Sequence, residues 1–335
     1  MTNRLSDARR SPSNSTLKGQ IMPVIDVRHL TKRYGTVSAV QDLSFSVQPG
    51  RVTGFLGPNG SGKSTTLRAI LGLVRPTSGS AFVLDQPFQA MAHPAAVVGA
   101  SLEAKAFHPG RTARQHLRIL ATAAGLRRSR VDHVLAQVGL DAAADRRAGG
   151  FSLGMAQRLS LAAALLGEPR MLVLDEPANG LDPAGAQWLR RLLRRFADDG
   201  GTVLLSSHAL SEVAQTVDDV IIINHGRLVT AGPLNHLNAL AETRVRVQSP
   251  HAERLQRLLS TRGKVAEFDG PSQLLLTGTT SAELGELASA HHVVIHAMTT
   301  QTSSLEDLFL ALTADHPRHP ADAPKNSHSP EGVRS

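Results

Sequence analysis

The stretch at residues 57–65, which reads GPNGSGKST, restricts the possible fold of this chain more than any other feature. The apolar run before it, at residues 52–56, has the pattern of a buried strand, and residues 66–74 have the spacing of an amphipathic helix. A strand, a loop of the form G-x-x-x-x-G-K-S and a helix in this order are typical of a phosphate-binding loop. Average residue usage produces this pattern by chance in on the order of one chain in a hundred of this length. The sequence therefore predicts an α/β domain that binds a nucleotide at this loop.

The residue types in the loop suit a nucleoside triphosphate. Its glycines allow the backbone N–H groups to point inward as an anion nest, and the helix that follows adds its positive end. Lys63 supplies a positive charge for the β- and γ-phosphates, and the hydroxyl of Ser64 suits a Mg²⁺ ligand. The predicted nucleotide contacts in the loop are Gly57, Pro58, Asn59, Gly60, Ser61, Gly62, Lys63, Ser64 and Thr65.

Composition excludes several classes of protein. The 335 residues include no cysteine, so a disulfide framework, a cysteine zinc site and a cysteine nucleophile are excluded. The sequence has no apolar run of about 18 residues, so it predicts no membrane span, and the polar residues 1–21 do not form a secretory signal. The net charge of +8 permits attraction to nucleic acid or anionic lipid. Because only 3% of residues are aromatic and no basic stripe is present, we favour an arginine-rich surface without a nucleic-acid partner.

Two strand ends carry candidate catalytic residues. Residues 171–174 form a short apolar run that leads into Asp175 and Glu176, as a central parallel strand does when it delivers a carboxylate to the ligand-binding edge of a sheet. Asp175 would hold hydrated Mg²⁺ and Glu176 would orient or deprotonate water; the alternative is a pair that caps the next helix. The strand predicted at residues 202–206 is followed by His208, whose position at a strand end distinguishes it from the other histidines.

The remaining candidates lie in turns or at a helix start. Tyr34, the only tyrosine, lies in a predicted loop, where its ring could stack on a base or pack on a strand edge. Residues 93–150 are rich in alanine and arginine and predict a helical insertion with helices at 113–126 and 131–138. Ser152 begins the next predicted helix, either as an ordinary N-cap or as part of a second phosphate site.

A second unit follows the nucleotide domain. Its predicted order over residues 243–313 is β-α-β-β-α-β-α, with the last strand at 292–298 and a closing helix at 305–313, which suggests a small ferredoxin-like module. We find no catalytic cluster in its sequence. Residues 1–22 and 314–335 are polar and predict disordered tails.

In order and spacing, residues 23–235 resemble the ATP-binding subunits of ABC transporters, in particular those that serve exporters of the ABC-2 type, such as drug, antibiotic and lantibiotic self-resistance pumps. The resemblance implies a P-loop NTPase fold with a mixed sheet, an antiparallel β subdomain, a helical subdomain at about residues 100–165, and an accessory α+β domain at 243–313. It also implies an ATPase that uses ATP and Mg²⁺. By this resemblance, Tyr34 stacks on the adenine, Glu176 is the catalytic base and His208 contacts the γ-phosphate. Asp175 is a Mg²⁺ ligand. Asp182 belongs to the D-loop, and Ser152 and Gly154 belong to the signature motif.

Two positions depart from the family pattern. The signature motif reads S-L-G-M, so that Leu153 and Met155 replace a glycine and a glutamine, whereas the phosphate-facing Ser152 and Gly154 remain. Glu103 occupies the position of the usual Q-loop glutamine. A carboxylate there is still a possible Mg²⁺ ligand, and we expect Glu103, Asp175 and Glu176 to converge on one Mg²⁺ and one water.

The resemblance also implies partners. The signature motif of one domain would cap the γ-phosphate held by another, so we expect a homodimer of two nucleotide-binding chains and a separate transmembrane permease, at the cytoplasmic face of the membrane. A non-transport ABC ATPase acting in translation or DNA repair is the alternative, but the single phosphate loop and the lack of a long coiled-coil insertion disfavour it. A nucleotide-binding regulator without turnover is disfavoured by the presence of both Glu176 and His208.

Overall fold

The computed structural model of the chain describes residues 22–236, 243–302, 309–310 and 313. The predicted tails therefore lie, apart from Met22, outside the described residues, as does most of the predicted closing helix at 305–313. None of the described helices is long and apolar enough to cross a membrane.

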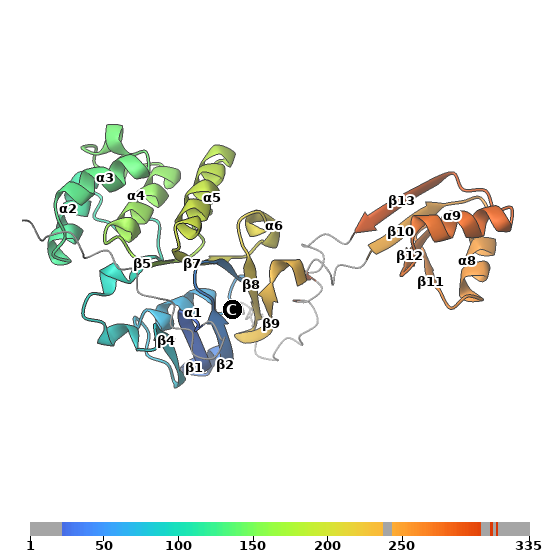
Figure 1. Cartoon of the computed structure of the whole chain (residues 1–335), viewed down its shortest axis with the longest axis horizontal. Coiled ribbons are helices and arrows are strands. Elements are labelled where there is room, and N and C mark those ends of the chain that lie inside the picture. The colour runs from blue at the N-terminus through green and yellow to red at the C-terminus, as the bar shows by residue number, and fades with distance from the viewer. Residues whose placement is uncertain (1–21, 237–242, 303–308, 311–312, 314–335) are drawn as a thin grey trace, which may run out of the picture.

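A six-stranded sheet forms the centre of the first unit (Figure 1). Its strands, in spatial order, are β5 (Val98–Ser101), β6 (Met171–Leu174), β7 (Thr202–Ser207), β3 (Val52–Leu56), β8 (Asp219–Asn224) and β9 (Arg227–Pro233). All neighbours are parallel except β8 and β9. Every residue of β3, β6, β7 and β8 is buried, as is typical of parallel strands that are covered on both faces. The carboxyl ends of β3, β6 and β7 therefore meet at one edge, as predicted for Asp175 and His208.

A three-stranded antiparallel sheet packs beside this centre. It consists of β2 (Val37–Val47), β1 (Ile25–Tyr34) and β4 (Ser78–Val83). Strand β2 is continuous, although its pairing with β1 shifts register near Asp42, whose φ of +50° bends the strand without ending it. Phe45 of β2 contacts Phe55 of β3 at 5.3 Å between ring centres, in a core that also includes the apolar face of α1 (Lys63–Ile70).

The predicted helical insertion contains α2 (Ala113–Ala123), α3 (Ser129–Gln137) and α4 (Leu153–Leu165). Helix α2 ends earlier than predicted, because Gly125 takes a left-handed conformation with φ +66°. The strand β5 was missed, since its sequence of four small or apolar residues lies inside a segment that reads as helical. Short 3₁₀ turns lie at Phe88–Ala90, Pro94–Ala96, Asp141–Ala143 and Ala148–Gly150.

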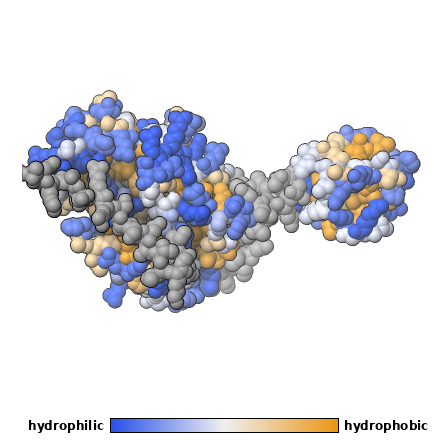
Figure 2. Space-filling view, in the orientation of Figure 1, coloured by the Kyte–Doolittle hydropathy of each residue, from blue (hydrophilic) through white to orange (hydrophobic). Residues whose placement is uncertain are grey.

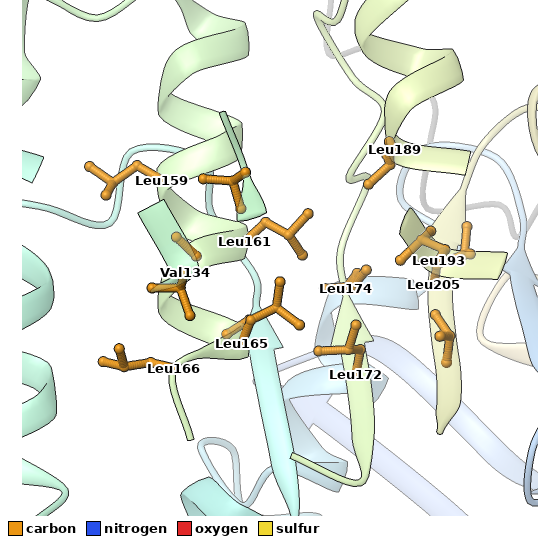
Figure 3. Close-up of a cluster of buried hydrophobic side chains, with 14 of the residues drawn as sticks. Val134, Leu159, Leu161, Leu165, Leu166, Leu172, Leu174, Leu189, Leu193 and Leu205 are labelled. Carbon is orange, nitrogen blue, oxygen red and sulfur yellow. The ribbon is translucent and has the colours of Figure 1, made fainter. Parts of the chain in front are cut away.

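Leucine side chains join this insertion to the central sheet. Figure 3 shows the cluster in which leucines of α4 face those of β6, α5 (Pro183–Asp198) and β7. Arg158 of α4 also stacks over the ring of Trp188 of α5 at 4.3 Å. The outward surface over α5 is hydrophilic (Figure 2), where Arg194 pairs with Asp198 and Asp218. A short helix, α6 (Leu210–Val213), follows β7.

The second unit has the predicted β-α-β-β-α-β order, in a four-stranded antiparallel sheet. Its elements are β10 (Thr243–Gln248), α8 (Ala252–Ser260), β11 (Val265–Phe268), β12 (Gln273–Thr277), α9 (Ser281–Ala290) and β13 (Ala297–Thr302). The last strand was predicted too early, at 292–298. The apolar residues of 292–296 favour a strand, but β13 begins at Ala297 and pairs with β10.

The chain then contacts the first unit again. Phe309 is 5% exposed and belongs to the hydrophobic cluster that contains β6, β7 and β8. The side-chain amide of Asn224, at the end of β8, donates to the carbonyl oxygen of Thr313 at 2.6 Å. Phe309 and Thr313 therefore pack with the nucleotide-binding unit and not with the second sheet, to which the sequence assigned them.

Candidate active site

The phosphate-binding loop joins β3 to α1 at the carboxyl edge of the sheet. Gly60 and Gly62 have φ values of +80° and +101°, in the left-handed region that glycine enters without strain. A Cβ at Gly62 would overlap the carbonyl oxygen of Ala39, and one at Gly57 would lie 2.5 Å from that of Ile223. Glycine is therefore required at both positions, and the backbone has the tight curl that the motif predicts.

Lys63, the first residue of α1, lies buried beside this loop. Its Nζ donates to the carbonyl oxygens of Gly57 at 2.7 Å and Pro58 at 3.2 Å. It also lies 3.4 Å from Oε1 of Glu176, and only 6% of its side chain is exposed. Glu176 and the two carbonyl oxygens compensate this buried charge here, and a phosphate bound at the loop would take over that role.

Asp175 and Glu176 follow β6 and are positioned by a residue of the neighbouring strand. The hydroxyl of Ser206 on β7 donates to Oδ1 of Asp175 at 2.5 Å and accepts the backbone N–H of Glu176 at 2.8 Å. Glu176 has φ +48°, an unusual conformation for a residue with a side chain, and the bond to Ser206 stabilises it. Ser206 is completely buried, so it supports the two acids from behind.

His208 completes a connected group of side chains. Its Nδ1 lies 2.9 Å from Oε2 of Glu176, whose other oxygen faces Lys63. The side chain of His208 is 43% exposed and that of Glu176 is 23% exposed, so water can reach both. The structure thus brings together Lys63, Asp175, Glu176 and His208 from three separate segments, and their roles in catalysis and Mg²⁺ binding stay predictions.

The residues present fit a Mg²⁺–nucleotide complex. The hydroxyl of Ser61 is buried and has no hydrogen-bond partner among the described residues, so it is available to a bound phosphate. The described residues contain no group of three or more histidine, aspartate or glutamate side chains that could hold a metal alone. Mg²⁺ typically takes one or two protein carboxylates and completes its shell with phosphate oxygens and water. Ser64 and Asp175 are the residues that would hold Mg²⁺.

Glu103 does not join this group. Its carboxylate pairs with Arg68 on α1 at 3.1 Å, and 67% of its side chain is exposed. The predicted convergence of Glu103 with Asp175 and Glu176 is therefore not present in this structure. The reason is the ion pair with Arg68, which lies on α1 one turn beyond the phosphate loop. The sequence did not indicate that this cation would face Glu103.

Tyr34 lies at the end of β1 with half of its surface exposed. The Nζ of Lys32 lies 4.8 Å from its ring centre. The ring is not packed into the core, so it is accessible for stacking, and its assignment to the adenine stays a prediction.

Ser152, Gly154 and Asp182 lie at the starts of two helices. Ser152 is the N-cap of α4 and accepts the N–H of Met155 at 3.3 Å, while Asp182 is the N-cap of α5 and accepts the N–H of Gly185 at 2.8 Å. The capping role that the sequence left open for Ser152 is thus observed, and it is Asp182, not the pair Asp175 and Glu176, that caps α5. No hydrogen bond or ion pair among the described residues joins Ser152 to Lys63, Asp175, Glu176 or His208.

Ser206 is the one residue of the site that sequence reasoning missed. A serine inside an apolar strand, one position before the segment Ser207–His208, was the only available signal. Its role depends on the register in which β6 and β7 pair, which a local pattern does not contain.

Comparisons with known proteins agree with this site. A family model described as ABC transporter matches residues 40–179, and a domain family of unknown function matches residues 243–306. The bacitracin transport ATP-binding protein BcrA of Bacillus licheniformis is 36% identical over 296 residues, which cover 86% of this chain and 97% of that protein. The lantibiotic transport ATP-binding protein SrtF of Streptococcus pyogenes is 34% identical over 206 residues, covering 62% of this chain and 89% of that protein.

Solved structures show the same fold. The structure of an ATP-binding subunit of an ABC transporter has a TM-score of 0.59 and 27% identity, and the match covers 65% of this chain and 92% of that one. A dimeric ATP-binding cassette in a post-hydrolysis state, bound to ADP and Pi, has a TM-score of 0.58 and 23% identity, covering 63% of this chain and 98% of that one. With its phosphate loop, strand-end carboxylates and histidine in the positions described, the chain belongs to the ATP-hydrolysing, ATP-binding subunits of ABC transporters.

Proposed function

We propose that this chain energises an ABC-2-type exporter of a peptide antibiotic or related drug, working as a homodimer on a separate permease at the cytoplasmic face of the membrane. The observation that carries the proposal is the position of Glu176, held between Lys63 and His208 at the edge of the sheet where the phosphate loop lies. The relatives named for bacitracin and lantibiotic transport support the class of cargo. No nucleic-acid partner is part of the proposal.

The geometry supports hydrolysis at this edge. Glu176 would accept a proton from the attacking water, and His208, bonded to the same carboxylate, would orient it and contact the γ-phosphate. Lys63 would exchange its backbone partners for the β- and γ-phosphate oxygens. Mg²⁺, when bound to Ser64 and Asp175, supplies charge stabilisation for the phosphates. Tyr34 would stack on the adenine and Glu103 would remain on the surface with Arg68.

The position of the signature motif supports the proposed pairing of two copies. Ser152 and Gly154 belong to the start of α4, which is not hydrogen-bonded to the phosphate loop within the described chain. Its N–H groups and its positive end suit the γ-phosphate of another copy. The cassette that is dimeric in its solved structure shares this fold and supports the same arrangement.

Two measurements test the proposal. The rate of ATP hydrolysis per molecule should rise with protein concentration, because a complete site needs two chains; a constant rate would contradict the pairing. Expression of the chain together with an ABC-2-type permease should raise the inhibitory concentration of a peptide antibiotic such as bacitracin. Glu176→Gln, expressed at the same level, should abolish that protection, and unchanged sensitivity to every peptide antibiotic in a panel would contradict the cargo class.

A further inference from the structure

The first turn of α4 touches the turn that precedes α5. Leu153 is 43% exposed, which is unusual for a large apolar side chain, yet its Cδ2 lies directly over Gly180. In the opposite direction, Leu181 reaches toward Gly154, where an added Cβ would lie 3.5 Å from its Cδ2. Each segment therefore presents one leucine to one glycine of the other.

Gly180 cannot be replaced without disturbing this contact. Its φ is +74°, and a Cβ there would overlap Cδ2 of Leu153. Position 180 must therefore meet two separate requirements: its backbone is left-handed, and it has no room for a side chain. Leu153, which departs from the family pattern, therefore packs against position 180, where only glycine leaves room for it.

We propose that Leu153 is a positioning residue, which fixes the turn at residues 179–182 against the start of α4. Ser152, the N-cap of α4, and Asp182, the N-cap of α5, are then held as one surface. This inference rests on the proposed pairing of two chains, since the surface acts on the nucleotide of the second copy. Leu153 touches no reacting atom, and its effect passes through the placement of Ser152 and Asp182.

A double-mutant cycle in the full chain tests the contact. Gly180→Ala should lower kcat about tenfold and Leu153→Ala about threefold. The double variant should stay within about threefold of Leu153→Ala alone, since the smaller side chain leaves room for the new methyl group. Leu153→Met, which keeps a long apolar side chain, should retain activity. Binding of a fluorescent ATP analogue should be unchanged throughout, because the phosphate loop of the same chain is not altered.

Gly200→Ala is the matched control. Gly200 has φ +89° but no neighbouring heavy atom within 4 Å of an added Cβ, so this variant carries backbone strain without the overlap. Its kcat should remain within about twofold of the parent. The proposal is overturned if Gly200→Ala and Gly180→Ala lose activity equally, or if the effects of the two single variants multiply in the double variant.

The result is separable from a failure of the proposed function. In a Glu176→Gln background, ATP should convert the protein into a dimer during size-exclusion chromatography. A stable dimer combined with multiplying effects contradicts only the role of Leu153. If no dimer forms and the hydrolysis rate per molecule does not depend on concentration, the pairing and this inference are both contradicted.

Discussion

The two faces that carry the site residues are built differently. At the phosphate-loop face, Lys63, Glu176 and His208 are linked directly, and Ser206 braces the acids from a completely buried position. At the signature face, the only hydrogen bonds that the side chains of Ser152 and Asp182 make within the described part of the chain are to the helices that they cap, and apolar contact joins the two segments. The side chains of the first face are held in place for chemistry, whereas the two segments of the second face are held in place as a contact surface. If two chains pair as proposed, hydrolysis should depend on contact with the second face of another copy, while the first face changes mainly in the partners of Lys63.

The largest effect should follow from removing the proposed base. Glu176→Gln should lower kcat by about 10²- to 10⁴-fold, because the amide cannot accept a proton, while the affinity for ATP is retained. Phosphate release and binding of a fluorescent nucleotide measure the two quantities. Glu168→Gln, at an exposed glutamate that pairs with Arg130, is the matched control and should leave kcat unchanged. A loss of less than threefold in Glu176→Gln would place the base elsewhere.

The brace behind the acids should have the next largest effect. Ser206→Ala leaves Asp175 and the N–H of Glu176 without a buried partner, so we expect about a tenfold loss of kcat and about 1–3 kcal/mol of destabilisation. Steady-state kinetics and chemical denaturation measure these changes. Ser160→Ala also removes hydrogen bonds, to Ser101 at 2.7 Å and to the carbonyl oxygen of Glu103 at 3.2 Å, but should change stability alone. Equal kcat losses in both variants would show that Ser206 has no specific role.

Glu103→Gln should have a small effect on hydrolysis. Because the carboxylate pairs with Arg68 at the surface, we expect the ATPase rate to stay within about threefold of the parent and stability to change by at most about 1 kcal/mol. Titration of Mg²⁺ in an ATPase assay checks both the rate and the metal requirement. Total loss of activity would mean that Glu103 belongs to the phosphate-loop face after all.

Acidification should weaken the helical side of the molecule. Burial, with a smaller contribution from the charge of Arg111, lowers the pKa of His116 on α2 below its ordinary value of 6.5. The unfolded chain then takes up a proton at a higher pH than the folded chain does. The free energy of unfolding should therefore be largest above pH 6.5 and decrease as the pH falls through and below this value. Denaturation at several pH values measures this free energy of unfolding. His116→Leu should reduce this slope, and an unchanged slope would exclude the histidine as its source.

Local patterns predicted those parts of the fold and the site that depend on neighbours in sequence. The glycine loop, the acids after β6 and the histidine after β7 follow from short motifs, since parallel strands place their carboxyl ends at one edge. Ser206, Arg68 opposite Glu103, and Leu153 over Gly180 depend on register and packing between distant segments, so no local pattern contained them. The strand β5 was missed because four small or apolar residues do not outweigh their helical surroundings.

Because the chain returns to the first unit at Phe309, the second unit is inserted into the first one and is not simply attached after it. The chain leaves the nucleotide-binding unit after residue 236, forms the four-stranded sheet and contributes Phe309 to the first hydrophobic core. A chain cut at the junction would lose this side chain as well, and the loss of a buried phenylalanine costs about 3–5 kcal/mol. Asn224, which holds Thr313, lies two residues before Gly226, whose N–H donates to the carbonyl oxygen of Ser61 in the phosphate loop. The contacts of Phe309 and Thr313 therefore link the chain after the second unit to the strand that supports the phosphate loop.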